Sequence, residues 1–137
     1  MGNNKNGITP ASGFQMRIER VNTDKTRKDI GSDTVYHVYF EMSEYPPPEW
    51  RSIFGRAWKS LNQTREAYTD GAFLVLHCPL EEVATTQLAA LKKVVAETNE
   101  AYTRYAQNEL TALQHREDLW KQERAAVDAM ASVLSFE

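Results

Sequence analysis

The fold is decided by residues 80–137, which read LEEVATTQLAALKKVVAETNEAYTRYAQNELTALQHREDLWKQERAAVDAMASVLSFE. These 58 residues include no glycine and no proline, the two residues that most disfavour a helix interior. Pro79 stands directly before them, and Glu81 and Glu82 follow in the first turn, where acidic side chains complement the positive end of the helix dipole. We therefore expect a helix that begins near residue 80 and spans most of this stretch.

Apolar side chains recur along this helix at alternating intervals of four and three residues. A first series holds Ala84, Leu88, Leu91, Val95, Tyr102 and Tyr105. A second series, offset by one residue, holds Ala106, Leu110, Leu113, Trp120, Val127 and Leu134. Such heptad spacing is typical of helices that pair with other helices, although Glu117 and Arg124 bring charge into the second series. The offset resembles an eleven-residue step inserted into the heptads.

The length of this helix limits how it can be covered. Unbroken, it would be roughly 80 Å long, whereas a compact domain of this size has a radius of gyration of roughly 14 Å. Either the helix pairs with another chain, or it breaks at the polar run 114–118, where Asp118 could cap a second helix that folds back. We favour a coiled-coil homo-oligomer, with a dimer as its expected form. Its expected interface is Leu88, Leu91, Val95, Tyr102, Tyr105, Leu110 and Leu113.

A chain of 137 residues indicates one domain, here in three parts: a flexible terminus at 1–12, a sheet-helix core at 13–79 and the helical segment at 80–137. The single cysteine excludes an intramolecular disulfide and favours a reducing, cytoplasmic location. We see no signal peptide, and the longest apolar run, 72–76, is too short to cross a membrane. Residues 1–79 hold ten Lys/Arg against nine Asp/Glu, and residues 80–137 hold six against ten. The net charge of −3 argues against a general nucleic-acid-binding protein.

Two stretches of the core alternate with the period of half-buried strands. Phe14, Met16 and Ile18 alternate with polar residues, and a clearer strand covers residues 34–42. In the second strand, one face holds Tyr36, Val38, Phe40 and Met42, and the other holds Val35, His37, Tyr39 and Glu41. The polar stretch between them, residues 22–32, is expected to be a loop.

A short helix and two further strands complete the core. Three prolines at 46–48 end the second strand, and the last of them can begin a helix over 48–61. The apolar stripe of that helix is Trp50, Ile53, Phe54, Ala57, Trp58 and Leu61. A short edge strand at 65–68, a turn at Asp70-Gly71 and a central strand at 73–78 follow. The order β-β-α-β-β-α indicates the α+β class, an antiparallel sheet with helices on one face.

Four residues of the core suggest chemistry. His37, Glu41, His77 and Cys78 contain the ligand and nucleophile types of a metal site or a cysteine enzyme. Their spacing matches no specific motif, and strand alternation places Cys78 with Leu74, away from His77. We therefore expect an inert thiol and surface histidines, with no catalytic residue, metal or cofactor.

Basic side chains provide a second alternative, a surface for nucleic acid. Arg51, Arg56 and Lys59 lie on the helix, Arg65 follows it, and Lys25, Arg27 and Lys28 lie in the loop. Tyr39 could then stack on a base. The sequence thus favours a small, soluble, non-enzymatic protein that self-associates through its long helix and serves as a protein-protein interaction module. A nucleic-acid-binding accessory protein is the second hypothesis, and an enzyme or metal protein is the third.

Overall fold

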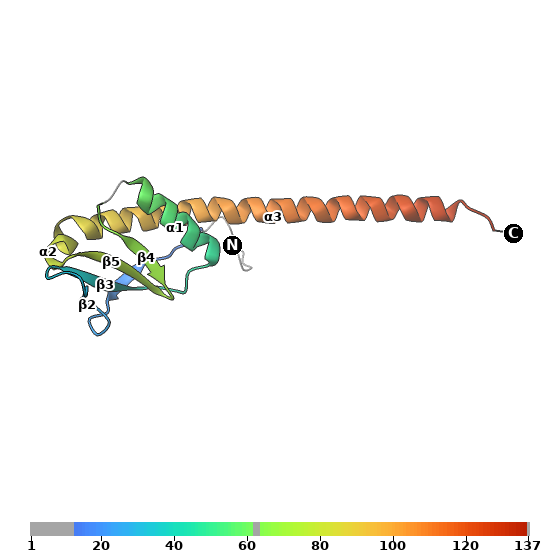
Figure 1. Cartoon of the computed structure of the whole chain (residues 1–137). Coiled ribbons are helices and arrows are strands. Elements are labelled where there is room, and N and C mark those ends of the chain that lie inside the picture. Colours follow the sequence, from blue (N-terminus) through green and yellow to red (C-terminus); the bar gives the residue numbers. More distant parts are fainter. Residues whose placement is uncertain (1–12, 62–63, 137) are drawn as a thin grey trace. The chain divides into compact units, whose positions relative to one another are not determined.

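The computed structural model describes residues 13–61 and 64–136. By its internal contacts the chain divides into two compact units, one ending at Thr103 and one beginning at Arg104 (Figure 1). The first unit, called here the sheet unit, contains a small antiparallel sheet and the helices packed on it. This arrangement, together with the long C-terminal helix, confirms the α+β class. The flexible terminus predicted at 1–12 lies outside the described residues.

The elements follow one another in the order that the sequence suggests, with two additions, a two-residue strand and a π-helical turn. They are β1 (Ile18–Val21), β2 (Arg27–Lys28), β3 (Val35–Met42), α1 (Pro48–Ser60), β4 (Ala67–Asp70), β5 (Phe73–Pro79), α2 (Leu80–Glu82), the π-helical segment η2 (Val83–Gln87) and α3 (Leu88–Ser132).

The sheet has the order β1-β3-β5-β4, and every pairing in it is antiparallel. Strand β2 pairs with the same edge of β3 as β1 does, but nearer the start of β3. The central position of β5 explains why its residues are apolar on both faces. Gly71, in the predicted turn, adopts a positive φ of 59°, which glycine tolerates better than other residues.

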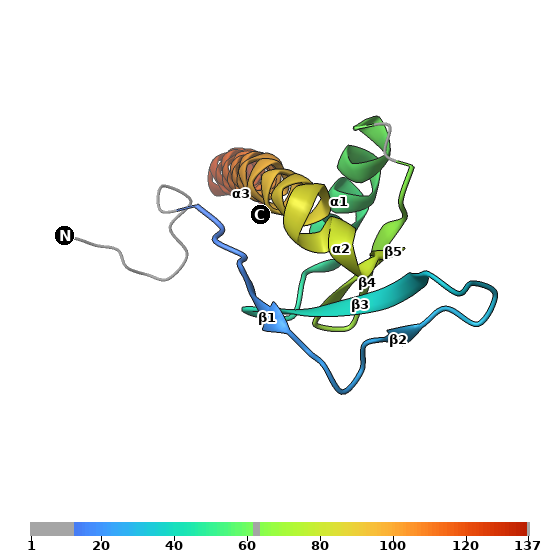
Figure 2. The ribbon, with the colours of Figure 1, turned by 90° about the vertical axis from the view of Figure 1, so that its left-hand side faces the viewer.

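Helices α1 and α3 lie on the same side of the sheet (Figure 2). They bury the face of β3 that carries Val38 and Phe40 and the face of β5 that carries Leu74, Leu76 and Cys78. Helix α1 begins at Pro48, as its sequence predicts, and it buries Trp50, Phe54 and Trp58 at intervals of four residues. The three rings stack in sequence, with centroids 5.6 and 6.2 Å apart.

The N-terminal strand differs from its prediction. Phe14 and Met16 precede β1 and bond side chains of α3 instead of a strand: Thr103 Oγ1 accepts from Phe14 N–H, and Asn99 Oδ1 accepts from Met16 N–H. Strand β1 itself carries an irregularity between Ile18 and Arg20. Strand β2 lies within the polar stretch that we expected to be a loop. The sequence did not predict it, because these two residues show no alternation of apolar and polar side chains.

Helix α3 runs unbroken from Leu88 to Ser132, so the break expected as an alternative at 114–118 does not occur. Its first part belongs to the sheet unit, where Leu91, Val94, Val95 and Thr98 are buried. The sequence suggested a boundary between the sheet-helix core and the helical segment at residues 79 and 80. The boundary between the two units lies within α3 instead, between Thr103 and Arg104. Within the described ranges, no helix combines the length and the apolar character that a membrane crossing needs.

Candidate interaction surface of the C-terminal helix

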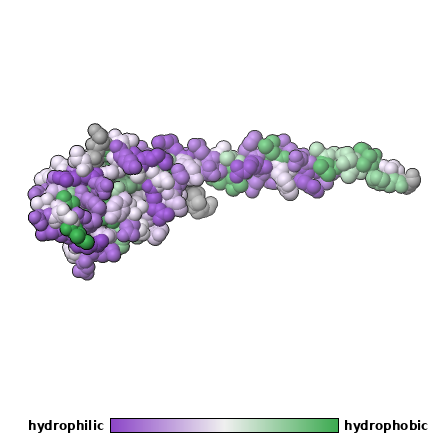
Figure 3. All heavy atoms as spheres, in the orientation of Figure 1, coloured by the Kyte–Doolittle hydropathy of each residue, from purple (hydrophilic) through white to green (hydrophobic). Residues whose placement is uncertain are grey.

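The second unit, from Arg104 onward, consists of the rest of α3 and the few residues that follow it, and its described residues are all at least partly exposed. Its large apolar side chains include Leu110, Leu113 and Trp120, which are 42, 46 and 61% exposed. Figure 3 shows hydrophobic residues along this segment, most densely toward its C-terminal end. We call the following set the C-terminal stripe: Ala106, Leu110, Leu113, Trp120, Val127, Ala131 and Leu134.

The structure divides the seven residues of the predicted oligomer interface. Leu91 and Val95 are 0 and 5% exposed in the core of the sheet unit, and Leu88 and Tyr102 pack against that core. Leu91 and Val95 are covered by their own chain, so their assignment to an intermolecular interface is wrong. They were misassigned because a helix on a sheet and a helix in a coiled coil share the same 4-3 spacing. Leu88 and Tyr102 are partly covered by the same core. The other three, Tyr105, Leu110 and Leu113, remain exposed.

Several exposed apolar residues of the second unit fall outside the heptad series, and sequence reasoning missed them. Leu119 and Met130 are each 51% exposed. Val133 and Phe136 follow the last helical turn and are also exposed. Composition alone could have revealed them, because nine large apolar residues fall between 110 and 136 without a sheet to cover them. Exposed apolar groups at this density are typical of interaction surfaces.

A cluster of polar rings lies on the other face of the sheet. His37 and His77 are opposite each other on β3 and β5, and their ring centroids are 4.0 Å apart. Asp29 Oδ1 lies 2.6 Å from His37 Nε2, and the Tyr68 hydroxyl lies 3.4 Å from His77 Nε2. Burial, followed by the charge of His37, lowers the pKa of His77. The hydrogen bond to His37 lowers the pKa of Asp29.

This cluster does not include the other two residues of the enzyme or metal hypothesis. Cys78 is fully buried in the core on the opposite face, and burial raises its pKa to about 11. Glu41 accepts hydrogen bonds from Arg20 and Asn22. The four residues therefore form no single site, which corrects that hypothesis. No group of three or more His, Cys, Asp or Glu side chains in the described part of the chain is arranged to hold a metal ion.

The basic residues of the loop and those of the helix, which we considered for nucleic-acid binding, do not lie together. Lys25 and Arg27 lie over the ring of Tyr39, on the face of the sheet away from α1, and Tyr39 is only 4% exposed beneath them. On the helical face, Arg65 donates two hydrogen bonds to the carboxylate of Glu82, at 2.7 and 2.9 Å. This ion pair lowers the pKa of Glu82. The loop and the helix thus form no common basic surface, and Tyr39 is not available to stack on a base.

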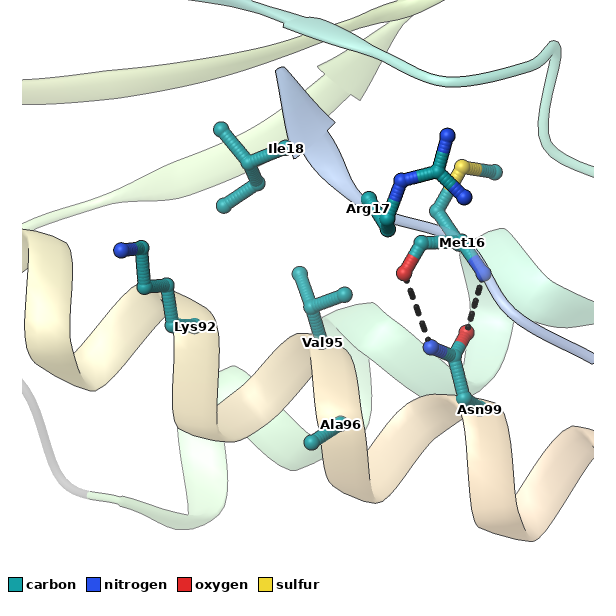
Figure 4. Close-up of a pocket in the computed structure, with 7 residues that line it drawn as sticks. All are labelled: Met16, Arg17, Ile18, Lys92, Val95, Ala96 and Asn99. Atoms are coloured by element: carbon teal, nitrogen blue, oxygen red, sulfur yellow. Dashed lines mark hydrogen bonds between the residues drawn. The ribbon is translucent and has the colours of Figure 1, made fainter. Parts of the chain in front are cut away.

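The sheet unit also has a shallow groove of about 280 Å³ between the start of β1 and helix α3 (Figure 4). Its walls are mostly apolar and include Ile18, Val95 and Ala96. Its lining includes two cations, Arg17 and Lys92, but no carboxylate or nucleophile, and Arg17 pairs with Glu19 outside the groove lining. This lining favours a packing irregularity over a reaction centre.

Among these surfaces, the C-terminal stripe is the strongest candidate for an interaction site, because its exposed apolar residues recur at the spacing of paired helices. Comparison with known proteins adds no relative: no family model, no curated protein and no solved structure matches this chain.

Proposed function

We propose that this protein is a non-enzymatic homo-oligomer, with a dimer as its expected form, that associates through the C-terminal stripe. One observation carries the proposal: apolar side chains recur at heptad positions over a helical segment that lacks any buried residue among those described. Full burial of a Leu or Val side chain contributes about 1.5–3 kcal/mol. Leu110, Leu113 and Val127 of both copies together would supply a substantial part of a dimer's stability.

The state of the helix itself supports this proposal. In proteins most of the stability of a helix comes from the packing of its apolar face. None of residues 104–132 is buried within its own chain. A second copy would cover the stripe and stabilise the helix at the same time.

In this proposal the C-terminal stripe joins the copies, and the sheet unit of each copy binds a protein partner. Its outer sheet face carries a mixed set of side chains, with Lys25 and Arg27 beside Tyr39 and with the His37–His77 pair. Polar and aromatic groups of this kind are suited to recognising a protein partner. A cytoplasmic location and the identity of that partner remain predictions.

The mass in solution tests the proposal directly. We expect light scattering on a sizing column to give the mass of two chains, or of a higher oligomer, across a concentration series. The variant Leu110→Glu/Leu113→Glu places charge in the stripe and should elute as a monomer with a folded sheet unit. The matched control is Asn108→Glu/His115→Glu, which adds the same charges on the opposite side of the helix and should keep the oligomer. A wild-type monomer at all concentrations would contradict the proposal.

A further inference from the structure

The charges within the C-terminal stripe distinguish the two ways in which helices can pair. In heptad notation, Leu110, Glu117, Arg124 and Ala131 are at a positions, and Ala106, Leu113, Trp120 and Val127 are at d positions. Leu134 continues this spacing just after the end of the helix. Glu117 and Arg124 are thus both in the seam, one heptad apart, and both side chains are exposed in the single chain. Any helix partner must accommodate these two charges.

A parallel pair would place identical residues opposite each other. In a parallel dimer, each a residue faces the same a residue of the other helix. Glu117 would therefore face a second Glu117, and Arg124 would face a second Arg124. Like charges in direct opposition destabilise an interface, and here they would occupy two successive a layers of the seam.

An antiparallel pair places a residues opposite d residues. When the pair is centred on Gln122, Arg124 of one copy faces Trp120 of the other, and Glu117 faces Val127. Each Glu117 then lies in the layer next to the Arg124 of the second copy, within reach of an ion pair. The Arg124 guanidinium can also lie over the indole ring of Trp120, a favourable cation–π contact. The same register pairs the large Leu113 with the small Ala131, as close packing requires.

Displacement by one heptad in either direction is less favourable. Centred between Ala125 and Ala126, the register sets Arg124 against Val127 and Trp120 against Ala131, so the cation–π contact is lost. Centred between Asp118 and Leu119, it sets the carboxylate of Glu117 against the negatively polarised face of Trp120. Arg124 would then face Leu113 and lose its aromatic partner. Charge and aromatic chemistry thus favour the register centred on Gln122.

We infer that a second copy of this chain covers the C-terminal stripe in antiparallel orientation, in register about Gln122, with Glu117 and Arg124 paired across the seam. This inference rests on the proposed self-association and adds its orientation and register. Disulfide trapping tests it with two single substitutions, Leu113→Cys and Ala131→Cys, each introduced into the full chain. The two variants are mixed under mild oxidation, and one of them carries a mass tag. Buried Cys78 stays in place, and the parent chain is the control for its reactivity.

The expected product is a mixed disulfide between positions 113 and 131. Along one helix these positions are about 27 Å apart, far beyond the reach of a disulfide, so the product reports orientation. Disulfides between two 113 positions would show a parallel dimer and overturn the inference, while the proposed function would stand. A dimer that forms neither disulfide would overturn the register. A monomeric mass would contradict the proposed function itself.

Exchange of the two charges tests the ion pair without cysteines. Glu117→Arg alone and Arg124→Glu alone should each weaken the dimer, because each sets like charges in neighbouring layers. The double variant restores opposite charges, so we expect it to dissociate about tenfold less readily than either single variant. All three keep strong helix formers, so the helix should persist. If the double variant is no tighter than the single ones, the charges do not meet across the seam.

Discussion

The side-chain amide of Asn99 bonds both backbone polar groups of Met16: Nδ2 donates to the carbonyl oxygen at 2.9 Å, and Oδ1 accepts from the N–H at 3.3 Å. Four residues further along α3, Thr103 Oγ1 accepts from the N–H of Phe14 at 2.9 Å. Two residues of extended chain advance about 6.6 Å, and four residues of helix advance about 6.0 Å, so the two repeats match. Helix α3 thus holds the segment before β1 much as a neighbouring strand would.

Replacement of Asn99 should destabilise the sheet unit. Asn99 Oδ1 also accepts a hydrogen bond from the indole N–H of Trp50, a fully buried residue. Asn99→Ala therefore leaves this N–H and the backbone N–H and carbonyl oxygen of Met16 without their partner. We expect a loss of about 1–3 kcal/mol in the free energy of unfolding, measured by denaturant titration. Asn108→Ala, on the exposed part of the same helix, is the control and should change it little. Equal stability of the two variants would show that the amide contacts contribute nothing.

The two tryptophans at 58 and 120 should behave oppositely. Trp58 is 3% exposed, stacks against Phe54 and donates to the carbonyl oxygen of Arg65 at 2.8 Å. We expect Trp58→Ala to lower the unfolding free energy of the sheet unit by roughly 3 kcal/mol or more, because it opens a large cavity. Trp120→Ala removes an exposed ring from the second unit and should leave that free energy unchanged. Denaturant unfolding followed by near-UV circular dichroism would measure both, and an unchanged midpoint for Trp58→Ala would contradict the prediction.

Acid should destabilise the sheet unit through His77. Burial and the neighbouring charge of His37 lower the pKa of His77 below its ordinary 6.5. Between pH 6.5 and the lower folded pKa, the unfolded chain binds more protons, so the unfolding free energy falls as the pH falls through this window. His77→Gln should flatten this part of the stability profile, whereas His115→Gln, an exposed residue of the second unit, should leave it as it is. Stability curves between pH 5 and 8 would measure the difference, and a slope retained in His77→Gln would assign it to other groups.

Cys78 should react slowly with thiol reagents while the protein is folded. Its side chain is fully buried, and its pKa is raised to about 11 from 9. The thiolate fraction at pH 8 is therefore about a hundredfold lower than for an ordinary thiol, before any effect of access. An added Ser132→Cys, at an exposed position, should label at the ordinary rate in the same molecule. Rapid labelling of the native parent chain would contradict this prediction, and denaturant should make Cys78 react fully.

The sequence could predict those elements whose spacing of apolar residues matches the single face that they bury. Strand β3 alternates because only one of its faces is covered by helices, and α1 carries aromatic rings at intervals of four because it packs on a flat sheet. The start of β1 could not be predicted, because Phe14 and Met16 are held by residues more than 80 positions away. A contact at that separation leaves no local pattern.

The sequence did not predict where α3 passes from the core of the sheet unit to the exposed segment, because the 4-3 spacing occurs in both parts. The arrangement of the apolar residues does distinguish the two parts. Leu91, Val94, Val95 and Thr98 follow the i, i+3, i+4, i+7 order, which makes a wide apolar face suited to a sheet. Beyond Arg104 the periodic apolar residues instead occupy a and d positions, as in a coiled coil, while Leu119 and Met130 lie outside this period. Leu91 and Val95 are buried in the sheet unit, so charge at either position should unfold it.

The two edges of the sheet have a consequence for how copies of this chain can be held together. Strand β4 has four residues, β1 has four and an irregular register, and β2 has two, both of them cationic. Short, irregular or charged edges are poor templates for a strand from another molecule. Even at the high local concentration inside the proposed oligomer, sheet units with such edges would resist continuous strand addition. Assembly through helices can then stop at a defined number of copies, without growth into fibrils.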